Sequence, residues 1–212
     1  MRSRVLPAIA LVATVLAATG LVGRPVAQAG DREPGPERYG IAVTRDVPVT
    51  LSDGTVLRAD IHVPADQETG QPAPGPFPVI VGLTPYGKRQ SADAGSGFGG
   101  LNPYLVKRGY LGVVVPGTGG SQGRSQLFGP DEAAASAQVI EWAARLPRST
   151  GRVGLLGHSY LAIDQLFAAA AVGPDSPLKA IFPMSAAADP YRDLFVSGGV
   201  VNMESSVGLI GA

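Results

Sequence analysis

A short segment of this sequence combines the residue types needed for nucleophilic catalysis by a serine. Residues 152–160 read RVGLLGHSY, so an apolar run ends in Gly157, His158 and Ser159. A serine at a sharp turn from a buried strand into a helix holds its hydroxyl clear of the sheet, and the next backbone N–H stays free to bind an oxyanion. Gly157 and Ala162 are small enough to let strand and helix approach closely at such a turn. The pattern therefore predicts Ser159 as the nucleophile of an acyl-transfer reaction.

The same serine also fits a role without chemistry. Serine is a preferred residue at the N-cap of a helix, where its side chain accepts a hydrogen bond from the first turn. The motif Gly-x-Ser-x-Gly is moreover incomplete, because Leu161 occupies the position of its last glycine. The choice between nucleophile and N-cap depends on the elements that surround Ser159.

The chain around Ser159 alternates between segments typical of strands and segments typical of helices. Residues 45–51 and 55–63 predict a hairpin across the turn Ser-Asp-Gly, and buried strands separated by helices follow it. The later strands are expected at residues 77–83, 110–115, 152–156 and 179–184, and the helices at residues 101–108, from Pro130 onward, and from Ser159 to about Ala171. This alternation predicts an α/β fold with a mostly parallel sheet and helices on both faces.

Parallel strands bring distant residues together at the carboxyl edge of a sheet, where the sites of α/β proteins lie. Tyr86, Gly117 and Ser159 each follow a predicted strand. We therefore expect Tyr86 to approach the space beside Ser159.

Two predictions concern which side chains are buried. Alternation along residues 55–63 places His62 on a polar, solvated face together with Arg58 and Asp60, which argues against His62 as a catalytic base. The helix predicted from Pro130 onward is expected to bury one stripe of apolar residues. The stripe consists of Ala133, Ala137, Ile140 and Ala144.

Composition excludes several classes of partner and site. The chain has 17 basic and 17 acidic residues and no basic run, which argues against nucleic acid as a partner. It has no cysteine, so disulfide bonds and thiol-linked lipid are excluded, and its two histidines provide no ligand cluster for a metal. The glycine-rich residues 116–123 lack the ending and the spacing of nucleotide-binding loops, so we expect a wide turn there and no cofactor.

The N-terminal residues have the pattern of an export signal. Arg2 and Arg4 precede an apolar run over residues 5–22, and Ala-Gln-Ala at 27–29 fits the small-x-small rule for cleavage. The length of the run leaves a membrane anchor as the alternative, although its Pro, Thr and Gly residues weaken a stable span. We expect a signal peptide at residues 1–29 and a mature protein that is secreted or held in the cell envelope, without stable membrane insertion.

Four motifs that occur in order resemble those of the X-prolyl dipeptidyl-peptidase / cocaine-esterase family of α/β-hydrolases. They are Ser-Asp-Gly-Thr at 52–55, Thr-Pro-Tyr-Gly-Lys at 84–88, Gly-Thr-Gly-Gly-Ser at 117–121 and Gly-His-Ser-Tyr at 157–160. The resemblance implies that residues 39–212, after a flexible lead-in at residues 30–38, form the N-terminal half of an α/β-hydrolase fold. Such a half has a mostly parallel sheet with an N-terminal antiparallel hairpin, and the family's helical cap would be just beginning at the C-terminus.

The resemblance also implies roles for three residues. Ser159 would be the nucleophile, and the backbone N–H of Tyr160 and the phenol of Tyr86 would form the oxyanion hole, where charge develops on the carbonyl oxygen. The substrate would be a small-molecule ester or a peptide, cleaved through an acyl-serine intermediate without metal or cofactor. The residues alone leave a structural role for Tyr86 open, in a turn beside Pro85.

The sequence departs from the family pattern at three places. The pattern Asp-x-Arg that usually precedes the glycine-rich turn is replaced by Val114 and Pro116, and the glycine that usually ends the nucleophile motif is Ala162. In α/β-hydrolases the catalytic acid and histidine follow the serine along the chain, but no histidine follows Ser159 here. His158 adjoins the serine on a turn where neighbours point apart, so we do not expect it to act as the base.

Two functions remain open on this sequence. The first is a secreted serine hydrolase of the X-Pro dipeptidyl-peptidase or esterase type, present as a truncated chain that is impaired because the catalytic Asp and His are absent. The second is a non-catalytic binding or complementing module. Asp189 could be the acid by its position after a strand, although Asp-Pro-Tyr at 189–191 fits more simply a turn into the cap. The apolar residues 207–212 favour the truncated chain.

Overall fold

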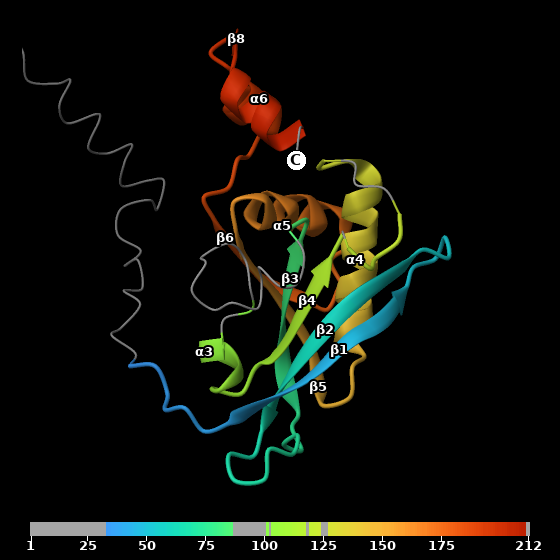
Figure 1. The fold of residues 1–212 in the computed structure, drawn as a ribbon, viewed down its shortest axis with the longest axis vertical. Helices are drawn as coiled ribbons and strands as arrows, with labels where there is room; N and C mark the ends of the chain where they lie inside the picture. The colour runs from blue at the N-terminus through green and yellow to red at the C-terminus, as the bar shows by residue number, and fades with distance from the viewer. Residues whose placement is uncertain (1–32, 87–100, 102, 118, 124–126, 211–212) are drawn as a thin grey trace, which may run out of the picture. The chain divides into compact units, whose positions relative to one another are not determined.

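The structure is a computed structural model that describes residues 33–86, 101, 103–117, 119–123 and 127–210, with side chains described up to residue 206. Contacts divide the chain into residues 1–35 and a compact unit of residues 36–212, which contains the helices and strands labelled in Figure 1. The predicted signal peptide lies outside the described residues. No helix in the described part of the chain is long and apolar enough to cross a membrane.

Within the described residues, six strands form one sheet in the order β1-β2-β4-β3-β5-β6 (Figure 1). Their bounds are β1 Gly40–Thr50, β2 Val56–Ala65, β3 Phe77–Thr84, β4 Leu111–Pro116, β5 Ser149–His158 and β6 Leu178–Met184. β1 pairs with β2, and β2 with β4, in antiparallel fashion, whereas β4, β3, β5 and β6 run parallel to one another. The predicted α/β fold is confirmed, with a mostly parallel sheet and an antiparallel hairpin at its N-terminal side.

Helices cover both faces of the sheet. α4 (Pro130–Ala144) and α5 (Tyr160–Ala171) pack on one face, where they enclose the main apolar core with β3, β4 and β5. Central members of this core are Val79, Val81, Val113, Val139, Ile140, Ala143, Val153, Leu155 and Ala168. On the opposite face, Leu101 and Val106 of α3 (Pro103–Val106) and its approach pack on Val114. Gly112 permits this contact, because a Cβ there would lie 2.0 Å from the side chain of Leu101.

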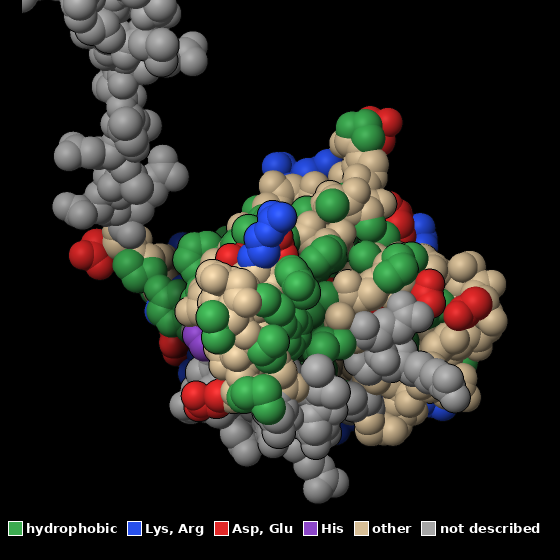
Figure 2. Space-filling model, turned by 90° about the horizontal axis from the view of Figure 1, so that it is seen from above, with side chains coloured by type: hydrophobic (Ala, Val, Ile, Leu, Met, Phe, Trp, Pro, Cys, Tyr) green, Lys and Arg blue, Asp and Glu red, His purple; other side chains and the backbone are tan. Residues whose placement is uncertain are grey.

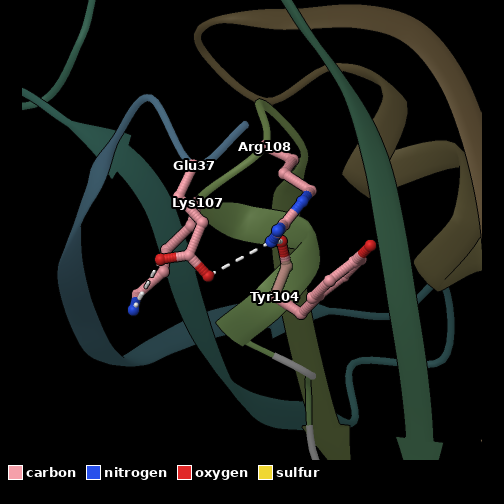
Figure 3. A network of polar contacts seen from close by, with 4 residues as sticks. All are labelled: Glu37, Tyr104, Lys107 and Arg108. Carbon is pink, nitrogen blue, oxygen red and sulfur yellow. Dashed lines mark hydrogen bonds and ion pairs between the residues drawn. The ribbon is translucent and has the colours of Figure 1, made fainter. Parts of the chain in front are cut away.

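A polar network fastens the chain before β1 to α3 and the residues after it (Figure 3). Lys107 Nζ and Arg108 Nη1 each donate to the carboxylate of Glu37 at 3.2 Å, and the guanidinium of Arg108 lies 3.5 Å from the centre of the Tyr104 ring. The carbonyl of Lys107 also accepts the N–H of Tyr39 at 3.1 Å. Because exposed ion pairs contribute little on their own, the backbone bonds that this carbonyl accepts from Tyr39 and, at 2.9 Å, from Arg38 matter most for fixing where β1 enters the sheet.

The prediction of a solvated polar face on the hairpin is wrong. Asp60 is only 3% exposed and pairs with Arg45 at 3.3 Å. His62 is half-buried, and burial lowers its pKa below the ordinary value. The register of β2 and β4 places His62 opposite Gly112, on the face that Leu101 covers. The alternation of apolar and polar residues distinguishes the two faces of a strand, but it does not show whether another segment of the chain covers the polar face.

The predicted buried stripe of α4 is also wrong in most positions. The buried residues are Ser136, Val139, Ile140 and Ala143, so only Ile140 was placed correctly. Alanines carry little apolar area, whereas Val139 and Ile140 gain much more from burial and so decide the rotation of the helix. A polar residue, Ser136, faces inward because it meets a buried side chain of α5.

After β6 the chain leaves the sheet. It forms a π-helical turn η1 (Tyr191–Phe195), a short hairpin of β7 (Val196–Ser197) and β8 (Val200–Val201), and α6 (Met203–Ile210), which packs on η1. Figure 2 shows hydrophobic side chains gathered on the side of the molecule seen from above Figure 1. Most of the large exposed hydrophobic side chains in the described residues belong to β6 and this segment, namely Phe182, Met184, Tyr191, Val200, Val201 and Met203.

Candidate active site

Ser159 lies at the turn between β5 and α5, as the sequence predicts. Its backbone has φ 59° and ψ −120°, a conformation that non-glycine residues rarely adopt and that costs of order 1–3 kcal/mol. Its N–H donates to the carbonyl of Met184 at 3.0 Å, and its own carbonyl accepts the N–H groups of Ala162 and Ile163 at 2.9 and 3.1 Å. The Ser159 side chain makes no capping hydrogen bond to α5, so the serine occupies the N-cap position without the N-cap role of its hydroxyl.

Small residues around the turn explain why the chain can close it. A Cβ at Gly157 would lie 2.3 Å from the Cβ of Leu161, so only glycine fits at the end of β5. Ala162 is fully buried, and the fold accommodates the methyl group that departs from the family pattern. The strained serine is thus fixed by close packing of β5 against the first turn of α5.

Tyr86 approaches the same place from the end of β3. Its N–H donates to the hydroxyl of Thr84 at 3.1 Å, and its ring stands edge-on to the ring of Tyr160, with 6.3 Å between centroids and an angle of 74°. The N–H of Gly117 donates to the carbonyl of Thr84 at 2.9 Å, which joins the ends of β3 and β4. The structure therefore brings Tyr86, Ser159 and Tyr160 together at the carboxyl edge of the sheet.

The phenol of Tyr160 is tied to a residue that the sequence did not single out as part of a site. It donates to both carboxylate oxygens of Glu132, in the first turn of α4, at 2.6 and 2.8 Å. Burial, with Glu132 as the second cause, raises the pKa of this phenol well above its usual range, so it remains a neutral donor. The sequence signal for Glu132 was only an acid in the first turn of a helix, which many helices have.

A cavity of about 320 Å³ lies beside Tyr160. Its polar lining includes Glu132 and Ser136 of α4, Asp164 of α5, and Thr55 from the start of the hairpin's second arm. Asp164 is 2% exposed, and burial, followed by the charge of Glu132, raises its pKa to about 7, although the hydroxyl of Ser136 donates to it at 3.3 Å. The lining of this cavity therefore includes a carboxyl group that can be protonated near neutral pH.

The described residues of the glycine-rich segment after β4 form hydrogen bonds with β2 and with the end of β4. The Ser121 hydroxyl donates to the carbonyl of Pro116 at 2.7 Å and accepts the N–H of Arg58 at 3.0 Å. Gln122 and Val56 exchange two further hydrogen bonds. Val114, where the family pattern has the acid, is buried against Leu101 and Val106.

The other candidate acid and base lie away from the three site residues or serve local structure. His62 pairs with Gly112 near the beginning of β4, whereas the site lies beyond the end of that strand at Pro116. The carboxylate of Asp189 accepts the N–H of Arg192 at 3.2 Å and pairs with its guanidinium at 3.3 Å. These contacts fit the predicted turn that leads from β6 into η1.

Comparisons with known proteins agree on one family. The sequence model of a family described as "X-Pro dipeptidyl-peptidase (S15 family)" matches residues 53–210. Cocaine esterase from Rhodococcus sp. (strain MB1 Bresler) is 32% identical over 172 residues, which are 79% of this chain and 28% of that esterase. A crystal structure of a CocE/NonD family hydrolase from Staphylococcus aureus superposes with a TM-score of 0.69 at 28% identity, covering 81% of this chain.

A more distant structure shares the fold alone. An aminopeptidase from a marine sediment archaeon, Thaumarchaeota archaeon, has a TM-score of 0.61 at 19% identity and covers 87% of this chain. This chain spans 28% of the length of the cocaine esterase and 32% of the length of each of these two solved structures. The residues that the family model matches contain the strands from β2 to β6 and the turn that carries Ser159.

Proposed function

Because the chain belongs to the X-Pro dipeptidyl-peptidase (S15) family of hydrolases, we propose that it supplies the nucleophile and the oxyanion hole of a serine hydrolase. The substrate class is an ester or a peptide bond, and residues 39–212 form part of the catalytic domain. One observation carries the proposal: Ser159 holds a strained turn conformation between β5 and α5 while its side chain makes no capping hydrogen bond. Rare backbone conformations of this kind cluster at active sites, where the surrounding structure holds them in place.

In the proposed reaction the hydroxyl oxygen of Ser159 bonds to the carbonyl carbon of the substrate, and the hydroxyl proton passes to a base. The negative charge on the carbonyl oxygen is met by the backbone N–H of Tyr160 and the phenol of Tyr86. Loss of the alcohol or amine leaves an acyl-serine, and water then releases the acid. In the family's chain order the acid and base come after the serine, and this chain has no histidine there. We propose that this chain on its own is therefore impaired.

Covalent capture in the presence of an added base tests this proposal. The purified chain is incubated with a 4-nitrophenyl alkylphosphonate, with and without imidazole, and the adduct is located by mass spectrometry of peptides. Imidazole stands in for the missing base, so we expect it to accelerate a single adduct on Ser159. The variant Ser159→Ala is expected to show no adduct at this peptide. Labelling scattered over other residues, at equal rates in both proteins, would refute the proposal.

A second candidate is a non-catalytic binding or complementing module. One observation favours it: in the described residues β6 is an edge strand of the sheet, with Phe182 62% exposed, and so could pair with a complementing segment. The same capture experiment separates the two candidates, because a module that evolved without catalysis has no reason to keep a reactive Ser159. Absence of imidazole-dependent labelling would support the module.

We also propose that residues 1–29 are a signal peptide and that the mature protein begins near Gly30 and is exported. Arg2, Arg4, the apolar run and Ala-Gln-Ala at 27–29 support this proposal. N-terminal sequencing of protein collected outside the cell tests it. An intact N-terminus recovered in the membrane fraction would show an anchor instead.

A further inference from the structure

We infer that Glu132 is a positioning residue for the proposed reaction: by holding the phenol of Tyr160, it fixes the backbone N–H of the same residue at the oxyanion. The inference rests on the proposed function, because it gives a role to a residue that does not itself meet the substrate. It is carried by the contacts around the Tyr160 side chain, which connect the turn at Ser159 to the first turn of α4.

The link from Glu132 to the oxyanion donor is short. Tyr160 is the first residue of α5, directly after Ser159, and its side chain is 4% exposed. Its hydroxyl donates to the two carboxylate oxygens of Glu132 at 2.6 and 2.8 Å, distances typical of charge-assisted hydrogen bonds. A residue held at both its backbone and the far end of its ring cannot rotate, so the direction of its N–H is fixed.

Glu132 is itself held in place. Its Oε2 accepts the backbone N–H of Phe128 at 3.0 Å. Phe128 has φ 65°, a left-handed conformation that a bulky residue avoids unless its surroundings impose it. The Phe128 ring stacks on the Tyr160 ring, with 4.2 Å between centroids and 28° between planes. Glu132 thus connects the backbone of Phe128 to the ring of Tyr160, and the two stacked rings and the carboxylate form one rigid group.

The same group reaches the second oxyanion donor. The ring of Tyr86 stands edge-on to the Tyr160 ring, 6.3 Å between centroids, while Phe128 stacks on Tyr160. Displacement of the Tyr160 ring would therefore displace Tyr86 as well. Loss of Glu132 is expected to loosen both donors of the oxyanion hole together.

The neighbouring carboxyl group makes this role specific to Glu132. Asp164 is buried nearby, and burial together with the charge of Glu132 raises its pKa to about 7. Asp164 also has a partner of its own, because the hydroxyl of Ser136 donates to it at 3.3 Å. Glu132 remains the acceptor for Tyr160 and Phe128, and Asp164 does not compete for these donors.

The test measures the first-order rate constant for phosphonylation of Ser159 at saturating 4-nitrophenyl alkylphosphonate, with a fixed concentration of imidazole. Glu132→Ala is expected to lower this rate constant by roughly 10- to 100-fold, because a misplaced oxyanion donor costs part of the rate that is lost when the donor is removed altogether. The half-saturating phosphonate concentration should stay unchanged. Glu132→Gln keeps an acceptor oxygen for the phenol and is expected to remain within about threefold of the natural chain.

A matched control and a second variant keep the result interpretable. Glu141→Ala removes an exposed carboxylate of the same helix, which pairs with Arg145 across one turn at 3.5 Å, and should leave the rate unchanged. Tyr160→Phe removes the hydroxyl from the other side of the bond and should reproduce the rate loss of Glu132→Ala. The double variant should be no slower than either single variant, because both remove the same contact.

The outcomes separate the proposed function from the role of Glu132. A natural chain that is not labelled at Ser159 overturns the proposed function and this inference with it. A natural chain that is labelled, while Glu132→Ala reacts as fast as Glu141→Ala, overturns the inference alone. Should Glu132→Ala fail to fold, Tyr160→Phe tests the same contact from its other side, and a Tyr160→Phe that reacts as fast as the natural chain would overturn the inference equally.

Discussion

The two sides of β5 differ in how completely they are enclosed. Toward β3 and β4, the apolar residues of the sheet are buried under α4 and α5, and the turn at Ser159 is held by Gly157 and by the contact of Tyr160 with Glu132. Toward β6, the sheet ends, and Phe182 and Met184 on that strand are 62% and 38% exposed. In the described residues, the enclosed side toward β3 and β4 brings together Tyr86, Ser159 and Tyr160, which we propose as nucleophile and oxyanion donors, whereas the open side, from β6 onward, contains no histidine that could take the proton of the serine.

The largest expected effect follows from that difference. We expect the purified chain to hydrolyse a 4-nitrophenyl ester roughly 10⁴-fold or more slowly than a complete member of the family, because loss of the base leaves only the oxyanion hole and binding. Ser159→Ala should then change the turnover little. A steady-state assay of both proteins checks this, with the complete enzyme as the positive control. A fast rate that disappears in Ser159→Ala would show that His158 or His62 acts as the base after all.

The second effect concerns the buried carboxyl group on the enclosed side. The pKa of Asp164 is raised to about 7 in the folded chain by burial and by Glu132, whereas an unfolded aspartate titrates near 4. Between these values the folded chain binds a proton that the unfolded chain does not. The free energy of unfolding therefore falls as pH rises, by roughly 4 kcal/mol in total, and the decline ends near pH 7.

Asp164→Asn isolates this contribution. The variant should be as stable as the natural chain near pH 4, and more stable at pH 8, where the buried carboxylate is charged. Urea unfolding of both proteins across this range measures it. His62, whose pKa is lowered by burial, changes stability with pH in the opposite sense, but it is present in both proteins and cancels in the difference. Parallel pH curves for the two proteins would contradict the prediction.

The enclosed side also shows what the sequence could and could not predict. The turn at Ser159 was predictable because strand, glycine and helix adjoin in the chain, and the approach of Tyr86 followed from the shared carboxyl edge of parallel strands. Glu132 was not, because its partner Tyr160 is 28 residues away and the contact depends on how α4 rotates. That rotation was itself mispredicted, since the alanines of α4 fit several faces equally well.

The sequence also could not predict which strand faces are covered by segments that are distant along the chain. Asp60 and His62 alternate with apolar residues, which is typical of a half-exposed strand, yet Leu101 lies over their face. No pattern in the sequence around β2 predicts that Leu101 covers this face. The roles of Ser159, Tyr86 and Tyr160 rest on the resemblance and on their placement together, and they stay predictions until the capture experiment is made.

A smaller effect is expected from filling the tight contact at the turn. Gly157→Ala places a Cβ 2.3 Å from the Cβ of Leu161, so β5 or α5 must shift. Overpacking of this kind lowers the free energy of unfolding by about 1–3 kcal/mol, and the shift should also slow the capture of Ser159. Gly173→Ala is the matched control, because a Cβ there meets nothing within 4 Å. Equal denaturation midpoints for the two variants would show that the turn is looser than the packing indicates.

The smallest effect is expected on the open side. Phe182→Thr replaces a largely exposed ring on the edge strand with a residue that suits strands, and the backbone N–H of residue 182 keeps its bond of 2.9 Å to the Gln165 side chain. The free energy of unfolding should change by less than about 1 kcal/mol. The concentration at which the chain aggregates should rise, because an exposed apolar edge strand promotes pairing between copies.

The matched substitution on the enclosed side is Val81→Thr in β3, where the side chain is fully buried in the main core. It introduces a hydroxyl without a partner and should lower the free energy of unfolding by about 1–3 kcal/mol. Urea unfolding and light scattering of the two variants measure both quantities side by side. If Phe182→Thr were as destabilising as Val81→Thr, the face of β6 would be covered in solution, and the contrast between the two sides of β5 would disappear. A loss that grows with protein concentration would identify a second copy of the chain as the cover, since stability that depends on association depends on concentration.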